Sequence, residues 1–316
     1  MEILCALSMN FYDKPDTMSE LPQKKSTKTY KKSNDPEFKK NSVRYNIHTQ
    51  SITLIQYQQQ EFESIRFQYS HTSQDLYRSI SDPDNSELLK SSLIINNSNG
   101  SMILITSDQK YVIKTISKRE KSVFVKILLE AYLNRVLDCV ESKLVRILGL
   151  FQVKPAKAYF VVMENTAVLD TECLRFDLKG STVDRFVTSM SGKTVLKDLN
   201  FKQSGIKVML ELEELEKVEK TLKDDFEVLR KVGIMDYSIY LVYYQSWFYQ
   251  IYPHYTVGNC SISIIDVFQL YDSKKAMERC LKIYGRCVNK ENLSSVSENE
   301  YFARIVKLLK EVFVTA

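Results

Sequence analysis

The sequence has few of the residues and patterns that mark several common protein classes. Its 316 residues include three widely separated histidines and one tryptophan, and its six cysteines form no CxxC pair. A structural zinc site and histidine-centred catalysis are therefore not expected, and the cysteines are typical of reduced intracellular thiols. No apolar run approaches the about 20 residues that a membrane-spanning helix needs. With Glu2 and only a short apolar stretch, the N-terminus is a poor signal peptide.

Positive charge is concentrated in two short segments, although the formal net charge is only +5. Residues 24–44 carry eight basic and two acidic side chains, and residues 274–290 carry six basic and one acidic. Such patches suit an anionic surface, or they are simply a solvated tail and a solvated helix face. The total charge is too small to indicate a nucleic-acid binder, and no nucleic-acid partner is expected.

The hydrophobic pattern predicts a tail and two ordered lobes. Residues 1–50 are polar, Lys-rich and without periodicity, so we expect a basic, largely disordered tail there. Residues 51–316 read as one catalytic domain with lobes of about 51–165 and 166–316. The first lobe is expected to hold two strands, a helix and two further strands. The expected elements are a hairpin over 101–116, helices over 118–140, 208–231, 273–284 and 298–313, and strands over 146–153, 158–163, 234–244 and 261–271.

Two patterns in the first lobe suggest phosphate binding. The polar turn over residues 97–101 leads into the hairpin, and its backbone N–H groups could face phosphate oxygens. Lys114 stands inside the apolar strand that follows, which is where nucleotide kinases place a phosphate-binding lysine. Each pattern alone also fits an ordinary surface hairpin and a lysine on the wet face of a strand.

Three acidic residues in the second half stand in unusual surroundings. Asp177 and Lys179 lie on one side of an extended segment, and Gly180 lets the backbone turn next to a ligand. Asp236 lies among apolar residues, and Asp266 ends an apolar run. Burying a carboxylate is costly unless it is paired or binds a metal. Either aspartate could be a structural acid, but two of them after a strand lysine indicate a magnesium–phosphate site.

The motifs together resemble the phosphatidylinositol phosphate kinase family. The resemblance rests on FDLKGST (176–182), GIMDYS (233–238) and IIDVFQLYD (264–272), in this order. It extends through NGSMILITSDQKYVIKTISKRE, LGLFQV, YFVVMEN, VLKDLNF and EYFARI, and so covers roughly residues 55–313. It implies an α+β fold with two lobes, antiparallel sheets and flanking helices, distantly related to protein kinases and with ATP between the lobes.

The resemblance also implies a reaction and its residues. ATP would phosphorylate an inositol-ring hydroxyl of a membrane phosphatidylinositol phosphate. Asp236 would orient the hydroxyl or accept its proton, Asp177 and Lys179 would shape the transfer site, and Asp266 would hold Mg²⁺. The expected contacts with ATP, over its phosphates and along a hinge facing adenine, are Gly100, Ser101, Lys114, Val161, Val162, Met163 and Glu164.

The second basic segment is expected to meet an anionic membrane. Lys274 and Lys275 match a lysine pair of the family, and Arg279 and Lys282 lie in the same segment. We therefore expect a cytoplasmic protein that is peripheral on the cytoplasmic face of membranes, and a homodimer is compatible with the family. The sequence departs from the family at Asn97, where a second glycine is usual, and at Glu298, where active members often have basic residues.

Several activities remain open from the sequence. Phosphatidylinositol 4-phosphate 5-kinase activity is expected because it is frequent in the family. The alternatives are a phosphatidylinositol 5-phosphate 4-kinase and a weakly active, phosphoinositide-binding scaffold. A soluble inositol polyphosphate kinase would have proline where Cys173 stands, and a protein kinase would need His-Arg-Asp and Asp-Phe-Gly motifs, which the sequence lacks.

Overall fold

The computed structural model describes residues 40–47, 50–85, 102–166, 173–188, 194–244, 252–270 and 297–316. The chain divides into two compact units. Unit 1 holds the described residues up to Lys121 and then Arg146–Asn165, and unit 2 holds Ser122–Val145 and the described residues from Thr166 onward. Asn165 is the last residue of unit 1. The helical segment within Ser122–Val145, expected in the first lobe, groups with unit 2 instead.

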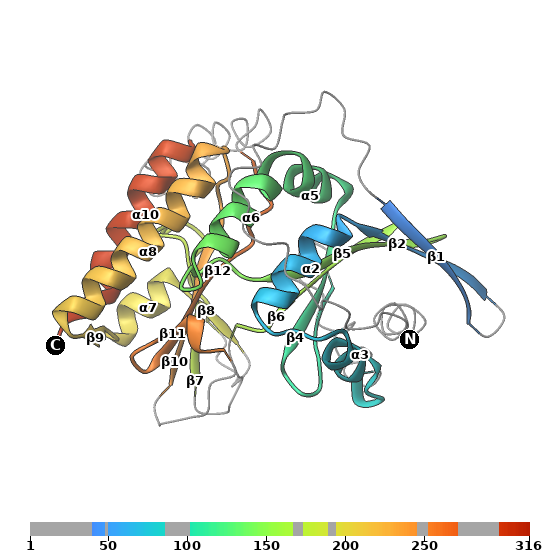
Figure 1. Ribbon diagram of the computed structural model, residues 1–316. Coiled ribbons are helices and arrows are strands. Elements are labelled where there is room, and N and C mark those ends of the chain that lie inside the picture. The colour runs from blue at the N-terminus through green and yellow to red at the C-terminus, as the bar shows by residue number, and fades with distance from the viewer. Residues whose placement is uncertain are drawn as a thin grey trace. The chain divides into compact units, whose positions relative to one another are not determined.

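Unit 1 is built on an antiparallel sheet with the order β1-β2-β5-β6-β4-β3 among its described strands (Figure 1). These strands are β1 (Lys40–Ile47), β2 (Gln50–Tyr57), β3 (Ile103–Ile105), β4 (Tyr111–Ile116), β5 (Ile147–Lys154) and β6 (Ala158–Glu164). Helices α2 (Gln59–Gln68) and α3 (Ser73–Ser81) follow β2. In α2, Phe62 and Ile65 are fully buried about one turn apart, so one side of the helix packs into the core.

Strand β1 corrects one expectation from the sequence. Residues 40–47 were expected to belong to the disordered tail, yet they pair with β2 along the full length of both strands, from Lys40 opposite Tyr57 to Ile47 opposite Gln50. Only Val43, Tyr45 and Ile47 alternate within a polar surrounding, which is too short a signal for a strand by itself. Residues 40–47 form a strand because the tertiary fold provides β2 as their pairing partner. The remaining residues expected in the tail lie outside the described residues.

The hairpin and the helix after it are present as expected, with one irregularity. β3 pairs with β4 in antiparallel register. The helical segment consists of α5 (Lys118–Val123), a π-helical turn (Phe124–Leu128) and α6 (Leu129–Asp138). A π-helical turn inserts an extra residue and shifts the helical phase. Within this turn Ile127 is 39% exposed, whereas Leu128 is fully buried.

Unit 2 contains a sheet with the described order β11-β12-β10-β7-β8 and a parallel pair of β13 with β9. Its elements are β7 (Cys173–Leu178), β8 (Val195–Lys197), α7 (Asp198–Ser204), β9 (Val208–Leu210), α8 (Leu212–Lys231), β10 (Ser238–Tyr244), a 3-10 turn (Pro253–Tyr255), β11 (Thr256–Val257), β12 (Cys260–Ile265), α10 (Glu298–Val312) and β13 (Phe313–Thr315). The expected helix over 208–231 begins only at Leu212, because Val208–Leu210 pairs with β13 instead.

Helices α8 and α10 pack side by side in unit 2 (Figure 1). Each buries one apolar stripe, with Leu222 and Phe226 on α8 and Tyr301 and Ile305 on α10. Such stripes drive helix packing because burying a large apolar side chain stabilises a fold by about 1.5–3 kcal/mol. Within the described parts of the chain, no helix combines the length and the apolar character that crossing a bilayer would demand.

Candidate active site

The register of the unit 2 sheet brings the predicted catalytic residues to one end of that sheet. Ser238, at the start of β10, lies opposite Ile265, at the end of β12. Ile239 lies opposite Leu178, at the end of β7. Asp236 precedes β10, Asp266 follows β12 and Lys179 follows β7, so all three leave the sheet at the same end. Residues separated by up to 87 positions in the chain are thereby neighbours in the fold.

The two acidic turns are tied together through their backbones. The N–H of Met235 donates to the carbonyl oxygen of Gln269 at 2.9 Å, and Ile234 forms a β-bridge with Leu270. Asp236 and Asp266 both adopt left-handed backbone conformations, each with φ of 62°. Aspartate tolerates this region better than most residues, but the conformation still costs free energy and is concentrated at functional sites. The left-handed conformations of the two aspartates therefore mark these turns as candidates for a catalytic site.

A direct ion pair joins two of the predicted catalytic residues. The Nζ of Lys179 lies 2.9 Å from Oδ1 of Asp236 and 2.7 Å from its backbone carbonyl oxygen. The two side chains keep 15% and 18% of their surface exposed, so they remain within reach of a ligand. Lys179 thus fixes both the carboxylate and the strained backbone of Asp236.

The turn that carries Lys179 is held by a carboxylate that the sequence did not single out. Asp198, the first residue of α7, is 2% exposed. Its Oδ1 accepts from the N–H of Lys179 at 3.0 Å and from the N–H of Gly180 at 2.7 Å. Its Oδ2 accepts from Nε of Arg185 at 2.6 Å. The only sequence signal for a role of Asp198 in the site is that it lies in VLKDLNF, a string shared with the family.

Arg185 connects this carboxylate to the third predicted catalytic residue. Its Nη2 lies 2.9 Å from Oδ1 of Asp177 and also donates to the Asp177 backbone carbonyl. Burial by itself would lower the pKa of the guanidinium, but the charges of Asp177 and Asp198 outweigh it and the pKa is raised. Arg185 therefore stays charged, and Asp177 is occupied by it rather than by Lys179.

Gly180 is required by two separate features of the turn. Its φ is +65°, in the left-handed region. A Cβ placed on it would lie 2.7 Å from Cγ of Arg304 and 3.3 Å from the backbone oxygen of Arg304, on α10. Helix α10 therefore lies directly against the turn that carries Lys179.

Aromatic packing fixes the residue after Asp236. The ring of Tyr237 lies edge to face with that of Tyr301, with centroids 4.9 Å apart, and stacks on Phe226 at 5.7 Å. The hydroxyl of Tyr301 donates to the backbone carbonyl of Tyr237. Burial, and next the charge of Asp236, raises the pKa of Tyr301 well above its ordinary value. Tyr301 thus remains a neutral donor at physiological pH.

The residues expected to bind ATP that the structure describes lie in the sheet of unit 1. Lys114 is half-buried on β4, opposite Ile103 of β3 and Val161 of β6. The expected hinge residues 161–164 are the buried end of β6, and the chain leaves the strand at Asn165, whose side chain donates to the carbonyl of Gln109 at 2.7 Å. The other predicted site residues, Gly100, Ser101, Lys274, Lys275, Arg279 and Lys282, lie outside the described residues.

Asp266 is a suitable ligand for magnesium. It is half-buried at the end of β12 and supplies a hard carboxylate oxygen. No cluster of three or more His, Cys, Asp or Glu side chains with metal-binding geometry occurs in the described ranges. Magnesium at nucleotide sites usually takes only one or two protein carboxylates, with phosphate oxygens and water as its other ligands. A single half-buried aspartate therefore fits a magnesium ion delivered with a nucleotide.

Comparison with known proteins gives the family. A model of the phosphatidylinositol-4-phosphate 5-kinase family matches residues 84–249, a segment that includes Lys114, Lys179 and Asp236. A phosphatidylinositol 4-phosphate 5-kinase of Plasmodium falciparum is 27% identical over 271 residues, which are 70% of this chain and 16% of that protein. A probable phosphatidylinositol phosphate kinase of Dictyostelium discoideum is 32% identical over 147 residues, 44% of this chain and 20% of that protein.

A third relative covers more of both chains. Phosphatidylinositol 4-phosphate 5-kinase 10 of Arabidopsis thaliana is 27% identical over 249 residues, 74% of this chain and 54% of that protein. In each of these comparisons the matched part is less than two thirds of the relative. Because the family model covers more than half of the chain, the protein belongs to the phosphatidylinositol-4-phosphate 5-kinase family.

Proposed function

We propose that the chain transfers the γ-phosphoryl group of ATP to a ring hydroxyl of a membrane phosphatidylinositol phosphate. Phosphatidylinositol 4-phosphate is the proposed substrate and position 5 the proposed acceptor, in line with the names of the relatives. The observation that carries the proposal is the Lys179–Asp236 pair. It stands on a turn anchored by Asp198, at the end of the sheet where Asp266 also lies.

Each residue has a role that suits phosphoryl transfer, a reaction that depends mainly on positioning and charge neutralisation. The carboxylate of Asp236 orients the attacking hydroxyl and accepts its proton, since a ring hydroxyl is a weak nucleophile. Lys179 holds that carboxylate in place through its 2.9 Å contact. Asp266 binds magnesium, which when bound neutralises charge on the nucleotide phosphates. Lys114, Gly100 and Ser101 contact those phosphates.

The membrane is the proposed location of the substrate. Lys274, Lys275, Arg279 and Lys282 are proposed to contact an anionic bilayer, where each basic residue near the surface adds about 1 kcal/mol of binding. This implies peripheral association with the cytoplasmic leaflet. A homodimer stays a prediction from the family resemblance.

A vesicle kinase assay tests the proposal. The full chain is mixed with ATP, Mg²⁺ and phosphatidylcholine/phosphatidylserine vesicles that contain phosphatidylinositol 4-phosphate, and the product isomer is identified by mass spectrometry. We expect the 4,5-bisphosphate, and a loss of at least about 10²-fold in rate for Asp236→Asn, in the range that general-base catalysis contributes. The matched control is Lys307→Ala on the exposed side of α10, which should keep the wild-type rate.

Other outcomes decide between the alternatives. Turnover of phosphatidylinositol 5-phosphate but not of the 4-phosphate would replace the proposed substrate with the runner-up. Vesicle binding without turnover of any monophosphorylated phosphoinositide would overturn the kinase proposal and favour a scaffold. Asp266→Asn should lose turnover and shift the Mg²⁺ dependence of ATP binding, which a purely structural aspartate would leave unchanged.

A further inference from the structure

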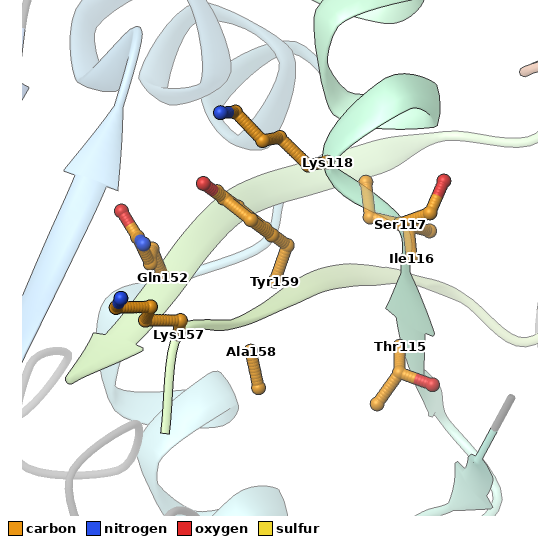
Figure 2. Close-up of a pocket in the computed structure, with 8 residues that line it drawn as sticks. All are labelled: Thr115, Ile116, Ser117, Lys118, Gln152, Lys157, Ala158 and Tyr159. Carbon is orange, nitrogen blue, oxygen red and sulfur yellow. The ribbon is translucent and has the colours of Figure 1, made fainter. Parts of the chain in front are cut away.

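Unit 1 contains a cavity of about 320 Å³ that the proposed reaction does not use (Figure 2). It lies where β4 ends and β6 begins, since Ile116 is opposite Tyr159 in the sheet. The expected hinge, by contrast, is at the other end of β6, at Glu164. The volume is at the lower end of the about 300–1,000 Å³ range of small-molecule sites. It suits a compact ring better than a nucleoside triphosphate.

Two of the polar side chains that line the cavity are cationic and can only donate hydrogen bonds. Lys118 and Lys157 both line it, and none of the lining residues that the structure describes is acidic. Figure 2 shows their amino groups on the same side of the view as the hydroxyl of Tyr159. The nearby carboxylate of Glu120 is engaged locally, because it accepts from the N–H of Ser117 at 2.7 Å. The cavity is therefore cationic.

A buried glutamine adds an oriented donor. Gln152 on β5 lines the cavity and is 7% exposed. Its Oε1 accepts from the hydroxyl of Tyr57 at 2.8 Å. With Oε1 engaged by Tyr57, the Nε2 group is the end of the amide that can donate to a ligand. Unlike a surface lysine, this donor is held in place before a ligand arrives.

A buried lysine strengthens the positive potential behind the wall of the cavity. Lys121 is 8% exposed, and its Nζ lies 5.0 Å from the ring centroid of Tyr57 and 5.5 Å from that of Tyr159. An ammonium group in such a partly desolvated place acts more strongly than one in water. The ring of Tyr159, with Ile116 and Ala158, also gives the cavity an apolar wall.

We propose that this cavity binds a phosphorylated polyol ring, such as an inositol phosphate, either free or as the headgroup of a lipid. Lys118, Lys157 and Gln152 would hold the phosphate oxygens, since lysine is a regular phosphate ligand. The apolar wall at Tyr159 would contact the carbon face of the ring. The site belongs to unit 1 alone and does not depend on the proposed kinase reaction, so each can fail without the other.

Lysine footprinting on the full wild-type chain tests the site directly. Acetylation of individual lysines by a limiting reagent is followed by peptide mass spectrometry, with inositol 1,4,5-trisphosphate as the probe. We expect saturable protection of Lys118 and Lys157 with a common midpoint. Lys307 and Lys310, exposed on α10, serve as internal controls and should not be protected. Equal protection by inorganic phosphate at the same concentration would overturn the proposal, because any anion would then suffice.

Two kinds of vesicle separate the sources of the ligand. Phosphatidylcholine vesicles contain either phosphatidylinositol 4,5-bisphosphate or enough phosphatidylserine to give the same surface charge. Protection by free trisphosphate supports a soluble or lipid-borne ring, and protection by bisphosphate vesicles alone supports the lipid source. Equal protection by phosphatidylserine vesicles would overturn the proposal in favour of a general membrane contact, and no protection by any probe would also overturn it.

A double substitution gives an independent measure. Lys118→Ala with Lys157→Ala should weaken trisphosphate binding, measured by calorimetry, at least about tenfold. The matched control, Lys307→Ala with Lys310→Ala, makes the same charge change on exposed residues of α10 and should bind as the wild type does. Equal weakening in both double variants would show a non-specific charge effect and contradict the proposal.

Discussion

Two buried carboxylates, one in each unit, are satisfied by different kinds of donor. In unit 2, Asp198 accepts from two backbone N–H groups and from Arg185. In unit 1, Glu164 is 1% exposed and lies 2.5 Å from Nε2 of His71, whose Nδ1 lies 3.3 Å from the hydroxyl of Tyr111. A carboxylate only accepts, so the network assigns Nε2 as the donor.

The difference reflects what each carboxylate supports. The guanidinium and the backbone donors of Asp198 stay the same across physiological pH, so the turn that carries Lys179 is fixed permanently. Glu164 has the imidazole of His71 as its side-chain partner in unit 1. The proposed catalytic turn, by contrast, rests on a permanently charged guanidinium and on backbone donors.

The largest expected effect comes from replacing each carboxylate by its amide. In Asp198→Asn an NH₂ group would face the Nε of Arg185, so a buried cation loses one partner, and breaking such a pair costs about 3–5 kcal/mol. Glu164→Gln should cost only about 1 kcal/mol, since an amide oxygen still accepts from His71. Urea titration with hydrogen exchange read on peptides of each unit gives both free energies. Equal losses of unfolding free energy in the two variants would contradict the expected difference between the two carboxylates.

A second pair of variants separates two restraints on the turn that carries Lys179, namely the left-handed backbone of Gly180 and its close approach to Arg304. Gly180 and Gly205 have nearly the same φ, +65° and +67°, but only Gly180 has a neighbour, Arg304, in the way of a Cβ. Gly205→Ala should cost about 1 kcal/mol from backbone strain alone, and Gly180→Ala about 2–3 kcal/mol with a loss of turnover. The difference in unfolding free energy measures the close approach of α10. Equal costs would show that Arg304 moves aside freely.

The smallest expected effect concerns the stability of unit 2 at alkaline pH. Burial raises the pKa of Tyr237 and Tyr301 in unit 2 and of Tyr111 in unit 1. A raised pKa in the folded state gives stability that is complete below the unfolded pKa of about 10 and is lost as the pH rises above it. Tyr301→Phe should cost about 1 kcal/mol at pH 7 through its lost hydrogen bond, and should flatten the fall of unit 2 stability above pH 10. Urea titrations at pH 7 and pH 10.5 check this, and an unchanged slope would contradict it.

Much of the site could be predicted from the motifs because they lie next to strands. The hairpin that carries Lys114 and the strands before Asp266 and after Asp236 form as their β-branched and apolar residues indicate. The motif residues could thus be assigned to strand ends. Their convergence could not be derived from spacing, because it depends on which strands pair. Asp198, Arg185 and Arg304 were missed for the same reason: each acts on a segment distant in sequence.

The sequence by itself determined the family, the ordinary strands and helices, and the identity of the proposed catalytic side chains, because motif and periodicity are local. Tertiary structure decided that β1 forms and that Lys179 contacts Asp236. It also decided that Lys118, Lys157 and Gln152 share one cavity. These are long-range outcomes of strand register and packing. They depend on the free energy of interactions between segments that are far apart in the chain. A local sequence pattern does not contain that information.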